Sequence, residues 1–217
     1  MMSVTTLIIA ITCIASFLGF SNQKLVDDLI FYPPAITNRN QWYRFFTCGF
    51  IHADVPHLAF NMLSLYMLGN ETEMLFQVIF KESGKFFYLL MYVSSLFFCL
   101  VPIYFKNKDN YHYRSLGASG AVSAVVFAFI FIEPTRGLGL MIIPGVYPPA
   151  FVFGFLYLGV SAYMAKKGNS NINHSAHLWG AVYGIIFLAI TSFAFTDYNL
   201  LSSFIHQVQD KIKSYTR

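Results

Sequence analysis

Two apolar stretches begin with residues that could carry acyl-transfer chemistry. Ser119 starts one of them, within the run Gly117-Ala118-Ser119-Gly120, and His177 starts the other. A serine hydroxyl becomes an effective nucleophile when a neutral histidine takes its proton. We therefore predict that Ser119 is the nucleophile and His177 the general base. Because neither stretch contains a carboxylate, we expect a Ser–His dyad rather than a triad.

A third apolar stretch offers groups that could stabilise an oxyanion. His57 and Asn61 are four residues apart, so they share one face of a helix. A tetrahedral intermediate needs donors already aimed at its oxyanion. We expect these from the Asn61 amide, the His57 ring and the backbone N–H of Ser119 at the positive end of a helix dipole. His52, about one turn earlier, is expected to support the site.

The composition indicates that these stretches lie in a lipid bilayer. The chain is 56% hydrophobic and only 11% charged, less than half of the charged fraction of about 25% that is usual for soluble domains. Its net charge of +4 is too small to suggest nucleic-acid binding. The lipid bilayer is therefore the predicted environment.

The elements that must position the site are predicted to be helices. A membrane-spanning helix needs roughly 20 mostly apolar residues. We predict an all-α integral membrane protein, a six-helix bundle in a single domain covering 1–217, with a structured first loop at 21–56. The predicted spans are about 4–20, 57–79, 84–104, 116–132, 150–165 and 175–195. The first is read as a retained helix rather than a signal peptide.

The fourth span is too short to cross the bilayer fully. Leu116 to Ile132 would reach about 25 Å at 1.5 Å per residue, against a hydrocarbon core about 30 Å thick. Ser119 would therefore lie in a wet pocket below the membrane surface. The second, fourth and sixth spans all begin on the same side, so their polar residues can converge there.

Small residues indicate how the base could reach the nucleophile. Gly180 and Gly184 follow His177 at intervals of three and seven residues, while Gly117 and Gly120 flank Ser119. Such small residues let two membrane helices approach closely.

Taken together, these motifs resemble those of the rhomboid family of intramembrane serine proteases. Gly117-Ala118-Ser119-Gly120 is similar to the family's GxSG nucleophile motif. The family's other motifs are matched by the base segment Ala176-His177-Leu178-Trp179-Gly180 with Gly184, by His52, His57 and Asn61 in an HxxxxHxxxN pattern, by Trp42-Tyr43-Arg44 in the first loop, and by Glu73.

The resemblance implies a six-helix bundle that cleaves single-span membrane proteins in or near their transmembrane segment, with no cofactor or metal. It also implies an inside N-terminus and, as we expect, a bacterial inner membrane location. The numbers of Lys and Arg on the two sides of the membrane do not by themselves favour this orientation. Ser123 departs from the family, whose members often carry an aromatic there that packs on the base. His177 would then need an aromatic from another helix, or water.

Three other functions are weaker alternatives. A metal site at His52, His57, His174 and His177 lacks the carboxylate or H-E-x-x-H pattern of zinc peptidases. An inactive relative that only binds membrane segments would have lost the nucleophile or base, and both are present. A channel would need polar residues through the full membrane depth. The sequence does not indicate an oligomeric state.

Overall fold

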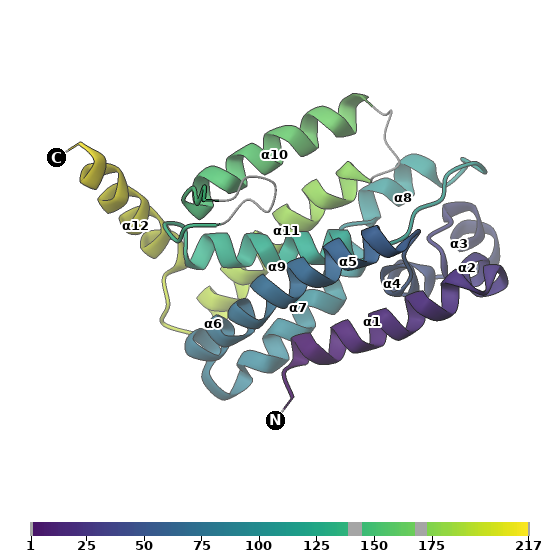
Figure 1. The fold of residues 1–217 in the computed structure, drawn as a ribbon, viewed down its shortest axis with the longest axis horizontal. Coiled ribbons are helices and arrows are strands. Elements are labelled where there is room, and N and C mark those ends of the chain that lie inside the picture. The colour runs from purple at the N-terminus through teal and green to yellow at the C-terminus, as the bar shows by residue number, and fades with distance from the viewer. Residues whose placement is uncertain (1, 139–144, 168–172, 217) are drawn as a thin grey trace.

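The computed structural model describes residues 2–138, 145–167 and 173–216 (Figure 1). The regular secondary structure within these ranges is helical, so the predicted all-α fold is confirmed for them. The helices are α1 (Val4–Phe20), α2 (Gln23–Leu29), α3 (Pro33–Arg39), α4 (Arg44–Thr47), α5 (Val55–Ser64), α6 (Asn70–Phe80), α7 (Gly84–Phe98), α8 (Val101–Asn107), α9 (Ser119–Ile132), α10 (Ala150–Lys167), α11 (His174–Phe195) and α12 (Leu200–Tyr215).

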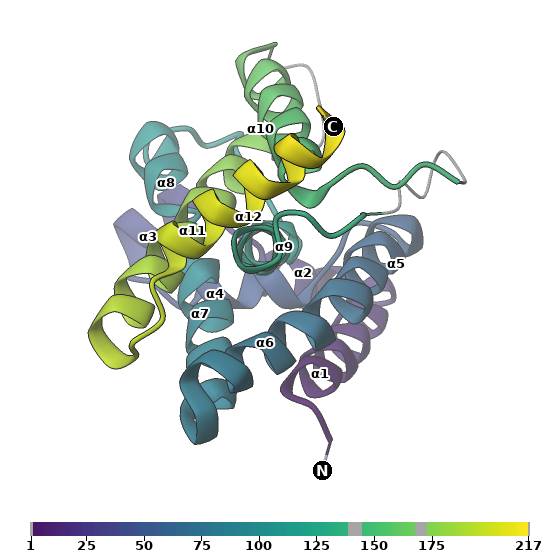
Figure 2. The same cartoon turned by 90° about the vertical axis from the view of Figure 1, so that its left-hand side faces the viewer.

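Helix α9 lies at the centre of the bundle. Figure 2 views it nearly end-on, with α5, α6, α7, α10 and α11 arranged around it. Its alanines at 121, 124 and 128 are fully buried, and its larger residues Phe127 and Phe129 lie in a second apolar cluster with Ala150 and Ala181. Small residues let the neighbouring helices approach on several sides at once. A helix surrounded in this way holds its first residue, Ser119, in a fixed place.

Helices α5 and α6 form one continuous rod, joined by a π-helical turn, η2 (Leu65–Gly69). The chain then reverses at Lys81, whose φ of 54° is left-handed, and returns as α7. The joined stretch Val55–Asn107, which contains this reversal, and α11 are the two described stretches that are long and apolar enough to cross a membrane. Helices α1 and α9 are apolar but shorter.

The helices differ from the predicted segments at three places. The segment 116–132 is helical only from Ser119, because Gly117 has a φ of +111° that a right-handed helix excludes. The segment 84–104 is broken after Phe98, and α8 restarts with Pro102 in its first turn, where a missing N–H is tolerated. Helix α12 was not predicted, because its apolar residues are interleaved with polar ones.

The first loop is built from α2, α3, α4 and a 3-10 turn, η1 (Cys48–Phe50). Arg44 is buried and donates hydrogen bonds to the carbonyl oxygens of Asp27 and Ile30, both at 2.8 Å. Trp42 stacks on Phe45 at 5.8 Å between ring centroids. Phe31 exchanges two backbone hydrogen bonds with Ser115. The first loop therefore supports the segment that leads to Ser119.

Candidate active site

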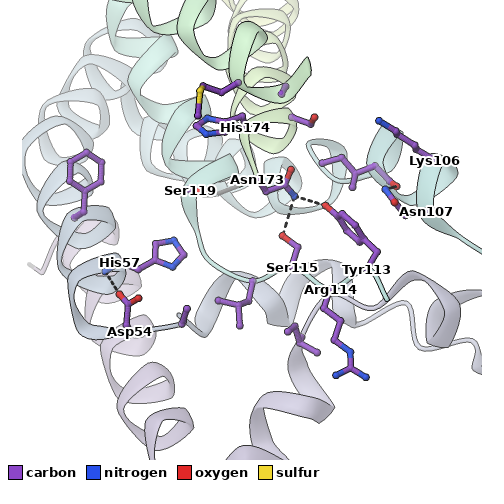
Figure 3. Close-up of a pocket in the computed structure, with 18 residues that line it drawn as sticks. Asp54, His57, Lys106, Asn107, Tyr113, Arg114, Ser115, Ser119, Asn173 and His174 are labelled. Carbon is purple, nitrogen blue, oxygen red and sulfur yellow. Dashed lines mark hydrogen bonds between the residues drawn. The ribbon is translucent and has the colours of Figure 1, made fainter. Parts of the chain in front are cut away.

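A cavity of about 700 Å³ opens where α5, α9 and α11 begin. Figure 3 shows side chains around it from three parts of the chain: Asp54 and His57 at α5, Ser119 at α9, and His174 at α11. The rest of the wall comes mainly from α8, the loop before α9 and the end of α10, with Ile30 of the first loop. The starts of the three predicted helices thus meet at one space, as the sequence led us to expect.

Ser119 is the first residue of α9 and lines this cavity. The preceding turn depends on Gly117, because φ of +111° is strained for any residue with a side chain. There is also no room for one: a Cβ at this position would lie 2.7 Å from Cε1 of His57. The His57 ring therefore packs directly against the turn that presents Ser119.

His52 fastens the same turn to α1. Its Nε2 accepts a hydrogen bond from the Ala118 N–H at 3.3 Å, so Nδ1 carries the proton and donates to Ser16 Oγ at 3.0 Å. Burial, together with the nearby His57, lowers the pKa of His52 to about 3. His52 is therefore neutral near pH 7, and both of its nitrogens are occupied. This pairing leaves it unavailable as a metal ligand.

Helices α9 and α11 touch backbone to backbone beside Ser119. A Cβ on Gly180 would overlap the carbonyl oxygen of Gly120, and a Cβ on Gly184 would overlap that of Ala124. A Cβ on Gly120 would in turn lie 3.4 Å from the Ala176 carbonyl oxygen. Because Gly120 follows Ser119 and Ala176 precedes His177, this contact holds the predicted nucleophile and base on facing turns.

Within the described part of the chain, the His177 ring is positioned by packing. Its Nε2 is buried and has no partner among the described residues. Tyr157 of α10 stacks on the ring at 6.2 Å between centroids with an interplanar angle of 21°. The Tyr157 hydroxyl lies 2.8 Å from Ser123 Oγ. An aromatic from another helix thus occupies the place left open by Ser123.

Asn61 is buried on α5 but does not line the cavity. Its Nδ2 donates one hydrogen bond, at 2.9 Å, to the carbonyl oxygen of His57 on its own helix. An amide nitrogen has two hydrogens, so a second remains for another acceptor. The structure brings His57 to the cavity wall and holds Asn61 one turn behind it.

Several residues at the site were not found from the sequence. Asn173 caps α11 by accepting from the Ala176 N–H, and it donates to Tyr113 and Ser115 at 3.0 Å each (Figure 3). Asp54 caps α5 by accepting from the His57 N–H at 2.7 Å. An Asn or Asp just before an apolar helix is a recognisable cap signal. Tyr157 had no such signal, because it is one tyrosine within an apolar helix.

Glu73 lies far from the cavity and anchors α1. Its carboxylate is buried and accepts hydrogen bonds from the Val4 N–H, the Thr5 N–H and the Thr5 hydroxyl at 2.9–3.0 Å. A carboxylate at a helix N-terminus also interacts favourably with the helix dipole. Glu73 therefore has a structural role in fixing α1 against α6.

Comparison with known proteins identifies the family. Residues 39–193 match the Rhomboid domain. RHOMBOID-like protein 12, mitochondrial, of Arabidopsis thaliana is 32% identical over 64% of this chain and 44% of its own length. Rhomboid-like protein 11, chloroplastic, of the same plant is 27% identical over 70% of this chain and 53% of its own length.

Rhomboid protease GluP of Bacillus subtilis is 25% identical over 83% of this chain and 33% of its own length. The chain thus spans about a third to a half of these relatives. The matched region contains all the residues that line the cavity except Ile30, and every predicted site residue from His52 to Gly184. On this evidence, the chain belongs to the rhomboid family.

Proposed function

We propose that this protein is an intramembrane serine endopeptidase that cleaves single-span membrane proteins in or near their transmembrane segment. One observation carries the proposal. Backbone contact between Gly120 and Gly180 holds the turn of Ser119, which opens on the cavity, beside the turn of His177, whose Nε2 has no partner in the described ranges. The name of the relative GluP, a rhomboid protease, agrees with it.

In the proposed reaction, Ser119 Oγ attacks the carbonyl carbon of the scissile peptide bond while His177 takes the hydroxyl proton. The Ser119 N–H, the His57 ring and the second hydrogen of Asn61 Nδ2 stabilise the resulting oxyanion. His177 then gives the proton to the departing amine, leaving an acyl-enzyme. A water molecule hydrolyses the ester, and His177 again carries the proton. The dyad needs no metal or cofactor.

We further propose that α1, the α5–α6 rod, α7, α9, α10 and α11 are six membrane spans. Large apolar side chains point outward from three of them: Val78 is 77% exposed, Phe155 70% and Phe193 90%. Such a surface suits lipid rather than water. Helix α9, with 14 residues, reaches only about 21 Å, which supports a site recessed below the membrane surface and reached by water.

The cell membrane of a bacterium, with the cavity on its outer side, is the location we propose. Transmembrane proteins are the proposed substrates. Relatives occur both in Bacillus subtilis and, by their names, in plant organelles.

The experiment that tests the proposal is labelling with a fluorophosphonate probe, which reacts with activated serines. Detergent-solubilised wild-type protein should be labelled, while Ser119→Ala and His177→Ala should not be labelled and should not cleave a model membrane substrate. Thermal unfolding of each variant serves as the control for folding. Full cleavage by purified Ser119→Ala protein would refute the assignment of the nucleophile. Binding of membrane segments without any cleavage by wild type would instead favour a binding-only relative.

A further inference from the structure

The aromatic ring that packs on His177 comes from α10, not from the helix of the nucleophile. Position 123 on α9, one turn after Ser119, carries a serine, which has no ring to offer. Tyr157 supplies the ring instead, nearly parallel to the imidazole at 21°. Its centroid distance of 6.2 Å lies within the range of about 4.5–7 Å at which aromatic rings interact.

Hydrogen bonds fix the direction in which Tyr157 points. Ser123 Oγ donates its only proton to the Ser119 carbonyl oxygen at 2.9 Å. The 2.8 Å contact between Tyr157 and Ser123 must therefore have the tyrosine as donor. A continuous path thus runs from the Tyr157 hydroxyl through Ser123 to the backbone of Ser119. Tyr157 contacts the ring of the proposed base and, through Ser123, the residue proposed as nucleophile.

Two further rings hold Tyr157 in place. Phe127 of α9 lies 5.6 Å from it and Phe153 of α10 lies 6.1 Å from it, between centroids. Farther along α10, Met164 and Ala165 line the cavity. The same helix therefore forms part of the cavity wall and carries the ring against His177.

We propose that Tyr157 is the positioning residue of His177, and that it makes the geometry of the dyad depend on where α10 lies. The inference rests on the proposed function. The stack limits rotation of an imidazole whose Nε2 has no hydrogen-bond partner in the part of the chain that the structure describes. When α10 moves away from α9, Tyr157 leaves with it and the base loses its support. The protein is then fully active only while α10 is packed on the bundle.

The first test replaces the ring while keeping apolar volume. Tyr157→Leu should lower the rate of fluorophosphonate labelling on the order of 100-fold, a loss that a misplacement of about 1 Å can cause. Tyr157→Phe keeps the ring and loses one neutral hydrogen bond, so it should stay within about 5-fold of wild type. Tyr163→Ala, on the exposed side of the same helix, is the matched control and should be unchanged.

A rescue variant separates positioning from folding. Ser123→Phe added to Tyr157→Leu returns an aromatic ring to the base from α9, and labelling should recover at least 10-fold over Tyr157→Leu. If Tyr157→Leu is labelled at the wild-type rate, the inference is overturned. The inference is also overturned if the labelling rate and the unfolding temperature fall together and Ser123→Phe does not restore labelling. Tyr157 would then be a packing residue. If wild type is not labelled at Ser119 at all, the proposed function fails instead.

A second test displaces α10. A Cβ on Gly154 would already lie 3.4 Å from Ile130 of α9, so Gly154→Leu should push the two helices apart. Gly159→Leu is the matched control, because no atom of the described residues lies within 4 Å of a Cβ there. Gly154→Leu should slow labelling in the wild-type background, where the ring comes from Tyr157 on α10. It should not slow labelling in the Ser123→Phe/Tyr157→Leu background, where the ring comes from α9. An equal loss in both backgrounds would overturn the dependence on α10.

Discussion

The imidazole of His57 lies against Gly117, so closely that a Cβ on Gly117 would be 2.7 Å from its Cε1 atom. This contact joins a proposed oxyanion donor to the turn that presents the proposed nucleophile. The two groups cannot move independently, because the turn has no side chain that could yield. Even a small side chain at residue 117 should therefore have a large effect on catalysis.

Gly117→Ala should reduce cleavage strongly, because it adds a clash with His57 to the strain of a positive φ. The strain alone is about 1–2 kcal/mol. Gly145→Ala is the matched control, since Gly145 has φ of +84° but no described residue within 4 Å of a Cβ. Both variants should lose similar unfolding free energy from strain, and only Gly117→Ala should lose kcat. Equal kcat values in the two would contradict a role for this contact.

Asn61→Ala should lower kcat by about 100- to 1000-fold, the range found when one oxyanion donor is removed. Asn70→Ala is a suitable control on the same helical rod, because Asn70 Nδ2 also bonds a carbonyl four residues earlier, at 2.8 Å from Tyr66. If both variants merely lower expression or unfolding temperature, Asn61 is a structural residue. Steady-state cleavage of a model substrate measures the difference.

Activity should depend on pH through His177, which accepts the Ser119 proton only when neutral. Cleavage should fall as pH drops through the pKa of His177. His52 should not contribute to the profile from pH 5 to 8, because burial lowers its pKa to about 3. A rate that does not fall on acidification, followed down to the pH at which the folded fraction is lost, would argue against a histidine base.

The lowered pKa of His52 does affect stability, so unfolding must be followed at each pH. Its folded-state pKa lies below the ordinary 6.5. The stabilising contribution is complete above about pH 6.5 and is lost progressively as pH falls toward 3. Cleavage rates should therefore be corrected for the folded fraction at each pH.

Glu73→Ala should destabilise the protein without changing the chemistry. Three donors at the start of α1 would lose their acceptor, for which we expect a loss of about 3 kcal/mol in unfolding free energy. Glu71→Ala is the control: its exposed pair with Arg136 should contribute less than about 1 kcal/mol. Thermal unfolding in detergent measures both. The kcat of the folded Glu73→Ala protein should match wild type, and a lower value would mean that α1 influences the site.

The sequence predicted the site residues better than the connections between them. Ser119, His177 and His57 stand at the starts of apolar segments, so their types and positions could be read directly. The contact between α9 and α11 was also predictable, because Gly180 and Gly184 recur on one helix face. The stack of Tyr157 on His177 was not, because it joins residues from two helices whose relative rotation no local pattern specifies.

The ends of helices were predictable where an apolar segment gives way to a polar one, and less predictable elsewhere. The start of α9 at Ser119 depends on the backbone of Gly117, and the break after Phe98 depends on Pro102 beginning a new helix. Both are local conformations inside apolar runs, where hydropathy stays constant. Helix α12 was missed for the opposite reason, since its apolar residues form a stripe rather than a run.

The contact of Gly120 with Gly180 has a consequence for how this protein can vary. Neither position has space for a methyl group. At Gly180 the methyl group would clash with main-chain atoms of Gly120, which no second substitution can remove. A change at either glycine must separate the two helices and move both proposed catalytic residues at once. In a library randomised at 120 and 180 and selected for cleavage, we expect the survivors to carry glycine at both positions, with no compensating pair.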